Sequence, residues 1–187
     1  GRTVFLPPVV ERYTDARDNF AWFKVVATHQ AAHVEFGSFT FHFDTPSTVF
    51  TINRRRQREH DLSQSRGGNH ADHGLGPMDA YTEIGRFLHL FANRQLAFDL
   101  FTILEDCRLD YRIAVEYPGI RGAAKRVQAD SLANRPTIET LPVQQALVEL
   151  LIRMSLEQLS DLPVPRIYEP AVVTLARVVH ALRTAQA

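Results

Sequence analysis

Two histidines four residues apart, His29 and His33, are the residues of this sequence best suited to chemistry. On an α-helix, residues at this spacing lie on one face, so both imidazoles can bind one metal ion. The spacing is that of the zincin motif H-E-x-x-H, whose glutamate is the general base toward a metal-bound water. Here Gln30 replaces that glutamate, and a neutral amide cannot accept the proton. Three interpretations follow: a metalloprotease helix, a metal site without the enzyme, or two packed histidines.

A third ligand is expected from the segment L-E-D-C-R at residues 104–108, which offers Glu105 or Asp106. Gluzincins take their third ligand from a glutamate on a later helix, and the order of elements fits that scheme. On a helix, Glu105 falls in a largely apolar stripe, where a carboxylate needs either a metal or a cationic partner. We therefore predict a zinc site of the two histidines and Glu105. In the alternative, the histidines pack in the core and Glu105 pairs with Arg108 or Arg112.

The most hydrophilic stretch, residues 54–77, lacks periodicity and is predicted to be a flexible polar loop. Residues 61–65 spell D-x-S-x-S, the metal-ion-dependent adhesion motif of von Willebrand A domains. That motif follows a buried hydrophobic strand, whereas here it follows a run of arginines, so we interpret the match as coincidence. His70, Asp72 and His73 can bind a metal, but their Gly-rich surroundings favour adventitious binding over a built site.

The elements that must position these residues are mostly helical. We predict a mainly α protein with a small β element, compatible with a zincin-like helix pair, in one mostly helical domain over residues 1–187. The first helix is expected to begin at a cap, Asp18 or Asn19, and to end at Gly37, with both histidines on its apolar face. The alternating phenylalanines of residues 38–44 predict a strand. Further helices are expected over residues 81–92, 94–117, 122–133, 137–159 and 169–184.

Composition limits the classes of partner. The 187 residues are 45% hydrophobic, which is enough for a real core. Twenty-one basic and 21 acidic residues cancel, and the basic run at residues 54–58 lacks interleaved aromatics, so we expect no nucleic-acid partner. No apolar run approaches a membrane span, so no membrane partner is expected. The single cysteine, Cys107, favours a reducing cytoplasm. The abrupt start without methionine suggests a fragment of a longer protein.

Two blocks of the sequence resemble a known family. They are F-L-P-P-V-V-E-R-Y-T-D-A-R-D-N-F-A-W-F-K-V-V-A-T-H-Q-A-A-H-V-E-F-G-S-F-T-F at residues 5–41 and L-F-T-I-L-E-D-C-R-L-D-Y-R-I-A-V-E-Y-P-G-I-R at residues 100–121. Together they are similar to the region outside the von Willebrand A domain in CbbO proteins and their NorD relatives. The pairing of the histidine block with L-E-D-x-R carries the resemblance, and the C-terminal helices are not covered by it.

The resemblance implies an adaptor rather than an enzyme. CbbO-type proteins work with MoxR-class AAA+ ATPases, and the CbbQ–CbbO pair is a Rubisco activase that releases inhibitory sugar phosphates, while NorD serves nitric oxide reductase. The chain lacks G-x-x-x-x-G-K-[ST], so it cannot itself be the ATPase. We therefore expect a non-catalytic subunit that links a CbbQ-like ATPase hexamer to a target, most simply Rubisco. A degenerate or active gluzincin-like zinc metallohydrolase is the alternative.

Overall fold

The protein is mainly α-helical in the computed structural model, which describes residues 3–67, 82–156 and 164–184. This confirms the predicted fold class. The helices are α1 Ala16–Glu35, α2 Thr51–Gly67, α3 Glu83–Leu88, α4 Arg94–Glu116, α5 Arg121–Ala133, α6 Val143–Ser155 and α7 Glu169–Thr184, with short 3-10 helices η1 Pro118–Ile120, η2 Ile138–Thr140 and η3 Arg166–Tyr168. Within the described ranges, none of these helices is long and apolar enough to cross a membrane.

The chain divides into two compact units, where we expected one domain. Unit 1 consists of residues 1–39 and 100–187, and unit 2 consists of residues 40–99. The boundary falls inside the sequence of α4, after Asp99. Both histidines and both carboxylates considered as ligands belong to unit 1, so the candidate site can be described within one unit.

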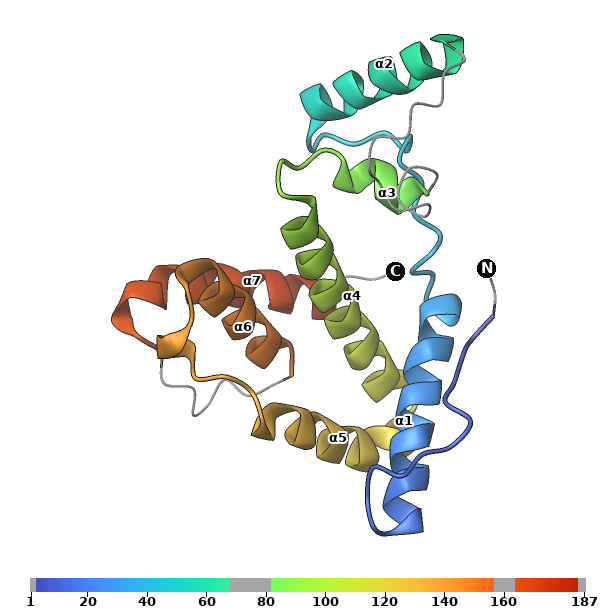
Figure 1. Ribbon diagram of the computed structural model, residues 1–187, viewed down its shortest axis with the longest axis vertical. Helices are drawn as coiled ribbons and strands as arrows, with labels where there is room; N and C mark the ends of the chain where they lie inside the picture. The colour runs from blue at the N-terminus through green and yellow to red at the C-terminus, as the bar shows by residue number, and fades with distance from the viewer. Residues whose placement is uncertain (1–2, 68–81, 157–163, 185–187) are drawn as a thin grey trace. The chain divides into compact units, whose positions relative to one another are not determined.

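Helix α4 is the centre of unit 1. Figure 1 shows it between α1 and the α6–α7 pair, with α5 beyond the last turn of α4 and beside α1. On one side, Cys107 packs with buried residues of α6 and α7. On another side, Leu109 and Ile113 pack against Ala32 of α1. Because α4 is buried on two faces, its register along α1 is set by apolar contacts, and that register decides which polar side chains meet α1.

Helix α1 begins earlier than predicted. Asp15, rather than Asp18 or Asn19, is the N-cap, and its carboxylate accepts a hydrogen bond from the backbone N–H of Arg17 at 3.0 Å. Asn19 has another role, because its amide bonds both the N–H and the carbonyl of Tyr13, at 2.8 and 2.7 Å. This contact fixes the segment before the helix. Three capping residues stand close together in the sequence, and only the path of the preceding chain selects among them.

Three of the five later helices predicted follow their ranges closely, and two do not. Helices α4, α5 and α7 begin and end within one residue of the expected positions, and α3 is shorter than predicted. The range 137–159 is divided instead into η2 and α6. Pro142 is the reason, because proline lacks an N–H and is disfavoured inside a helix but tolerated at its start, where it precedes Val143. Helix α6 ends at Ser155, and residues 157–163 lie outside the described part.

The predicted strand at residues 38–44 is wrong, since the described residues contain no strand. The backbone groups of this segment are bonded by side chains instead. The N–H of Phe43 donates to the Glu83 carboxylate at 2.7 Å, and the Arg54 guanidinium donates to the carbonyls of Phe43 and Thr45. A strand needs a neighbouring strand to bond its backbone. No neighbouring strand is present among the described residues. The alternating phenylalanines therefore reflect the burial of Phe43 and do not indicate a sheet.

The loop predicted over residues 54–77 is also wrong for its first part, because residues 54–67 belong to helix α2. Arginine, glutamine and glutamate are good helix formers, and the helix carries an i,i+4 pair of Arg55 with Glu59 at 3.5 Å. The D-x-S-x-S sequence lies in this helix, and Asp61 pairs with Arg86 at 3.0 Å. The match to the adhesion motif is therefore still interpreted as coincidence. Residues 70, 72 and 73 lie outside the described residues.

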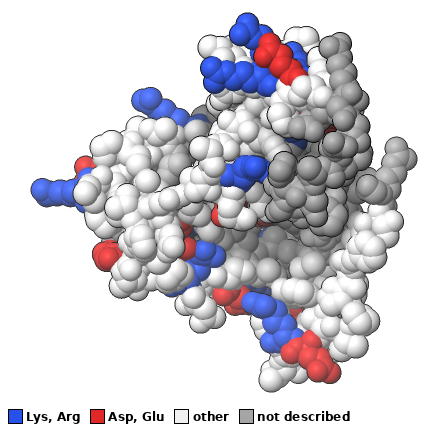
Figure 2. Space-filling model, turned by 45° about the horizontal axis from the view of Figure 1, so that its top comes forward, with Lys and Arg blue, Asp and Glu red and all other residues white. Residues whose placement is uncertain are grey.

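Charge pairing is the organising feature of unit 2. Asp44 accepts from Arg58 at 2.8 Å and from Arg86 at 2.9 Å, and the bonds from Arg86 and Arg58 hold the pKa of Asp44 below its usual value. On the face that Figure 2 shows, basic side chains lie at several separate places and acidic ones lie beside some of them. Two arginines of the basic run, Arg55 and Arg58, thus have acidic partners.

Candidate metal centre

The two histidines of α1 lie on one face, as their spacing predicts. Their rings are 5.1 Å apart between centroids and stand nearly perpendicular. The side chains are about one-fifth exposed, at 21% for His29 and 20% for His33. They are therefore neither fully buried core residues nor surface residues, and their ring nitrogens are positioned to meet groups from α4.

The end of α1 brings a hydroxyl to His33. Gly37 adopts a positive φ of 75°, a conformation that glycine enters without steric cost. The N–H of Ser38 then bonds the carbonyl of His33 at 2.9 Å, the long-range bond of a Schellman motif. This turn places the Ser38 Oγ 3.0 Å from the Nδ1 of His33. The predicted end of the helix at Gly37 is confirmed, and it has a consequence for the histidine that the sequence did not reveal.

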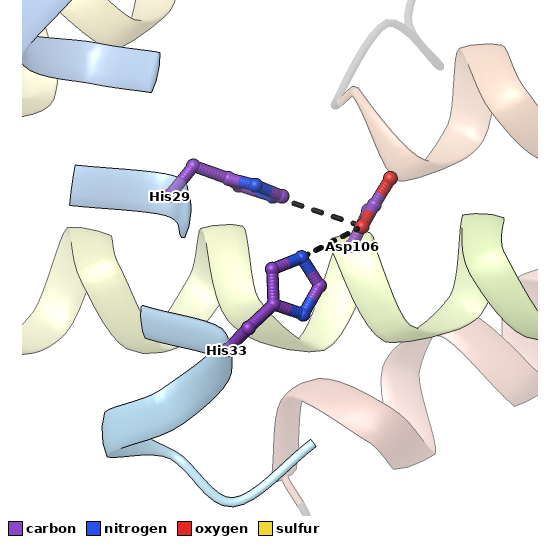
Figure 3. Close-up of side chains that lie close together, drawn as sticks. All are labelled: His29, His33 and Asp106. Carbon is purple, nitrogen blue, oxygen red and sulfur yellow. Dashed lines mark ion pairs between the residues drawn. The ribbon is translucent and has the colours of Figure 1, made fainter. Parts of the chain in front are cut away.

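Asp106 of α4 supplies the carboxylate that faces both histidines. Its Oδ1 lies 3.8 Å from the Nε2 of His29 and 3.8 Å from the Nε2 of His33. The three potential ligand atoms all lie within 4.8 Å of one another. Figure 3 shows the two imidazoles from α1 converging on the Asp106 carboxylate. Imidazole nitrogen and carboxylate oxygen together form a donor set that suits zinc and related divalent transition metals.

A second carboxylate stands one turn further along α4. The Oδ1 of Asp110 lies 3.5 Å from the Nε2 of His29. Its other oxygen, Oδ2, accepts a hydrogen bond from the amide of Gln128 at 3.1 Å. The two aspartates are four residues apart, so the i,i+4 pair of histidines on α1 faces an i,i+4 pair of aspartates on α4.

Glu105, the predicted third ligand, is engaged elsewhere. The group of potential ligand atoms contains Asp106 in its place. Arg108 donates to both oxygens of Glu105, at 2.6 and 2.9 Å, and Ser38 Oγ donates to Glu105 Oε1 at 2.5 Å. Arg108 also donates to the carbonyl of Phe36 at 3.0 Å. The predicted alternative, a pair with Arg108, is confirmed, while Arg112 instead lies over the ring of Phe36.

The carboxylates of this region differ in their tendency to ionise. Burial works against the charge of Glu105, but the hydrogen bonds from Arg108 and Ser38 outweigh it and lower the pKa. Burial raises the pKa of Asp106, against the attraction of the two histidines. Burial, together with the charge of His29, lowers the pKa of His33, which favours the neutral imidazole. The neutral ring is the form that binds metals.

A cavity of about 280 Å³ adjoins the cluster. It is lined by His29 and Asp110 on the side of the cluster, by Cys107 and Tyr111 from α4, and by Arg121 and Lys125 from the start of α5. Sequence reasoning did not find this cavity, because its walls come from segments far apart in the chain.

Two members of the site were missed from the sequence. Asp110 had a usable signal, since it follows Asp106 at the spacing that His29 and His33 also show. Ser38 had none, because its position beside His33 depends on the turn at Gly37.

Comparison of the chain with known protein families, with curated proteins and with solved structures gave no match. The site itself offers two imidazoles and two carboxylates where α1 and α4 meet.

Proposed function

We propose that this chain forms part of a cytoplasmic adaptor that links a MoxR-class AAA+ ATPase to its target, with Rubisco as the target and release of inhibitory sugar phosphates as the result. One observation carries the proposal. The two sequence blocks that resemble CbbO proteins are 67 residues apart at Ser38 and Glu105, yet these side chains bond directly in unit 1. The paired blocks therefore build one structural unit.

The chemistry of the unit favours a binding role over catalysis. Gln30, at the position of the zincin general base, is an exposed neutral amide. Glu105 is held by Arg108 and Ser38, so it is committed to joining α4 to the end of α1. A general base contributes about 10²–10⁴-fold to rate, and none stands at the zincin position. The residues of the two blocks thus serve to fix two helices against each other.

The test is reactivation of Rubisco by the full-length protein together with its ATPase. Rubisco inhibited by a sugar bisphosphate is incubated with ATP, the CbbQ-like ATPase and the adaptor, and carboxylation is followed over time. We expect reactivation that requires the adaptor, and co-purification of the adaptor with both proteins. Failure to associate with either protein would overturn the proposal. Association with the ATPase alone would keep the adaptor class and reject Rubisco as the target.

Variants connect this activity to the structure. The variant Arg108→Gln removes the bond that joins α4 to the Phe36 carbonyl at the end of α1, together with the pair that Arg108 forms with Glu105 within α4. We expect it to reduce reactivation. The matched control is Arg55→Gln on α2, whose side chain is exposed and pairs only within its helix. Equal losses in both variants would contradict a role for the joined blocks.

A gluzincin-like zinc hydrolase is the second candidate, favoured by the cluster of His29, His33 and Asp106. It predicts cleavage of a fluorogenic peptide by the zinc-loaded protein, abolished in His29→Ala. The adaptor proposal predicts no cleavage under the same conditions. Restoring the glutamate with Gln30→Glu offers a direct comparison, because only this variant would regain a proton acceptor at the zincin position.

A further inference from the structure

The side chains of the cluster face one another as ion pairs at distances longer than a hydrogen bond. The N···O separations of 3.8 Å between Asp106 and each histidine exceed the 2.7–3.2 Å range of an N–H···O hydrogen bond, and the 3.5 Å separation of His29 and Asp110 does as well. Such distances are longer than those of a direct N–H···O hydrogen bond. They leave a space between the donors that their mutual hydrogen bonds do not close.

That space has the dimensions of a metal site. Ligand atoms about 2.0–2.1 Å from zinc in a tetrahedral site stand about 3.3 Å apart. The separations between the histidines and aspartates are 3.5 and 3.8 Å, so these pairs need an inward movement of about half an ångström to reach zinc. The ligand atoms of His29, His33 and Asp106 all lie within 4.8 Å of one another, so the widest pair moves further. Rotation of partly exposed side chains provides a movement of this size without shifting either helix.

Groups outside the cluster already orient the donors. The Nδ1 of His33 lies 3.0 Å from Ser38 Oγ, which directs the Nε2 of the same ring toward Asp106. Ser38 is held in turn by Glu105. The amide of Gln128 holds one oxygen of Asp110 and leaves the other beside His29. Partners of this kind fix the ring orientation of ligating histidines and the rotamers of ligating carboxylates in metal sites.

We infer that His29, His33 and Asp106 bind one divalent transition-metal ion of the zinc class, which joins α1 to α4, with Asp110, beside His29, as the fourth ligand. Two imidazoles favour zinc, cobalt or nickel over calcium and magnesium, which prefer oxygen ligands alone. The adjoining cavity, lined by His29 and Asp110, gives the ion a route to the site. The inference goes beyond the adaptor function and does not depend on it.

The experiment is a metal titration of the intact chain. The protein is freed of metal with a chelator, dialysed, and titrated with Zn²⁺ by calorimetry, with elemental analysis of the loaded protein. Titration with Co²⁺ adds a visible spectrum that reports histidine and carboxylate ligands. We expect one ion per chain and the spectrum of a four-coordinate site. Absence of a stoichiometric ion would overturn the inference.

Variants assign the ligands. We expect His33→Gln and Asp106→Asn to weaken Zn²⁺ binding by more than about 100-fold, and Ser38→Ala, which removes an orienting group, by about 10–100-fold. Asp110→Asn is expected to weaken binding and to change the Co²⁺ spectrum. Unchanged affinity in Asp110→Asn would reject the fourth ligand. Circular dichroism of each variant before loading separates loss of binding from loss of fold.

The polar segment provides the control. The double variant H70A/H73A removes the two histidines of the Gly-rich stretch and leaves the cluster intact. We expect it to retain one ion per chain. Loss of the ion in H70A/H73A, together with its retention in His33→Gln, would place the metal in the polar segment and overturn the inference.

Discussion

At the scale of single residues, the adjacent carboxylates Glu105 and Asp106 of α4 have different partners. Glu105 is bonded by Arg108 and Ser38, and its pKa lies below the usual value because these bonds outweigh burial. Asp106, the next residue, faces the histidines without a direct hydrogen bond to either. Neighbours on a helix point about 100° apart, which is enough to send one carboxylate to the end of α1 and the other to its histidine face.

The Glu105 pair is expected to contribute measurably to stability. In Glu105→Gln the Arg108 guanidinium loses its charged partner in a site where both side chains are largely buried, at 14% and 18% exposed. We expect a loss of about 2 kcal/mol in the free energy of unfolding, measured by urea denaturation. The control Glu116→Gln affects a more exposed pair, in which Glu116 is 50% and Arg112 29% exposed, and where we expect less than about 0.5 kcal/mol. Equal losses would contradict this assignment.

A second prediction concerns pH and Glu149. This carboxylate is 4% exposed and accepts from Arg135 and Arg153. Burial opposes its charge, but these bonds prevail and its folded-state pKa lies below the ordinary 4.5. A lowered folded pKa means that the stabilisation is complete above about pH 4.5 and is lost as the pH falls through the folded pKa.

We therefore expect Glu149→Gln to cost about 3 kcal/mol at pH 7, with the difference from the wild type shrinking below pH 4.5. Urea midpoints measured from pH 7 to pH 3.5 give the comparison. The exposed Glu139, three residues before Pro142, provides the control through Glu139→Gln. A difference that stays constant over this range would show that Glu149 acts through packing and not through its charge.

At the scale of elements, the end of α1 and the register of α4 together make the site. Gly37 turns the chain so that Ser38 returns to His33, and Arg108 bonds the carbonyl of Phe36 in the same turn. The buried Leu109 and Ile113 hold α4 against Ala32 of α1. These apolar contacts fix the position of α4 along α1. They therefore also fix which residues of α1 the polar side chains of α4, such as Asp110, contact.

The turn at Gly37 gives a prediction at this scale. Alanine at a positive φ costs about 1–2 kcal/mol, so Gly37→Ala is expected to lower the free energy of unfolding by that amount. Gly37→Asn is expected to cost less, because asparagine tolerates this conformation. The control is Gly122→Ala in α5, where an added Cβ has nothing within 4 Å and where alanine should stabilise the helix by about 0.5–1 kcal/mol.

At the scale of the whole molecule, two compact units imply two cores that are stabilised separately. Unit 1 has its core around α4, while unit 2 centres on Phe43, which is fully buried. The guanidiniums of Arg54 and Arg86 lie over its ring, 4.8 and 4.5 Å from the ring centre. The candidate metal centre belongs to unit 1 alone. A substitution that destabilises one core should therefore lower the stability of its own unit much more than that of the other.

Hydrogen exchange tests this division. Phe43→Ala is expected to destabilise unit 2 by about 3–5 kcal/mol and to speed amide exchange in α2 and α3, while exchange in α6 and α7 stays unchanged. Leu109→Ala, at a fully buried site of unit 1, is expected to show the opposite pattern at a cost of about 2–5 kcal/mol. Faster exchange throughout both units in either variant would show a single cooperative structure instead.

The sequence by itself determined the helices with strong periodicity and the shared face of His29 and His33. These properties depend on residues within a few positions of one another, which is why α4, α5 and α7 were predicted closely. It did not determine α2, because a charged helix has no apolar stripe and its charges are paired from outside by residues such as Asp44 and Arg86.

Only the tertiary structure decided which carboxylate meets the histidines. Glu105 and Asp106 were both candidates from the sequence, and both are ligand types that zinc accepts. The choice was made by Arg108 and Ser38, which bond Glu105, and by packing across α1 and α4 that turns Asp106 and Asp110 toward His29. Contacts between segments some 70 residues apart depend on three-dimensional packing, so local spacing cannot predict them.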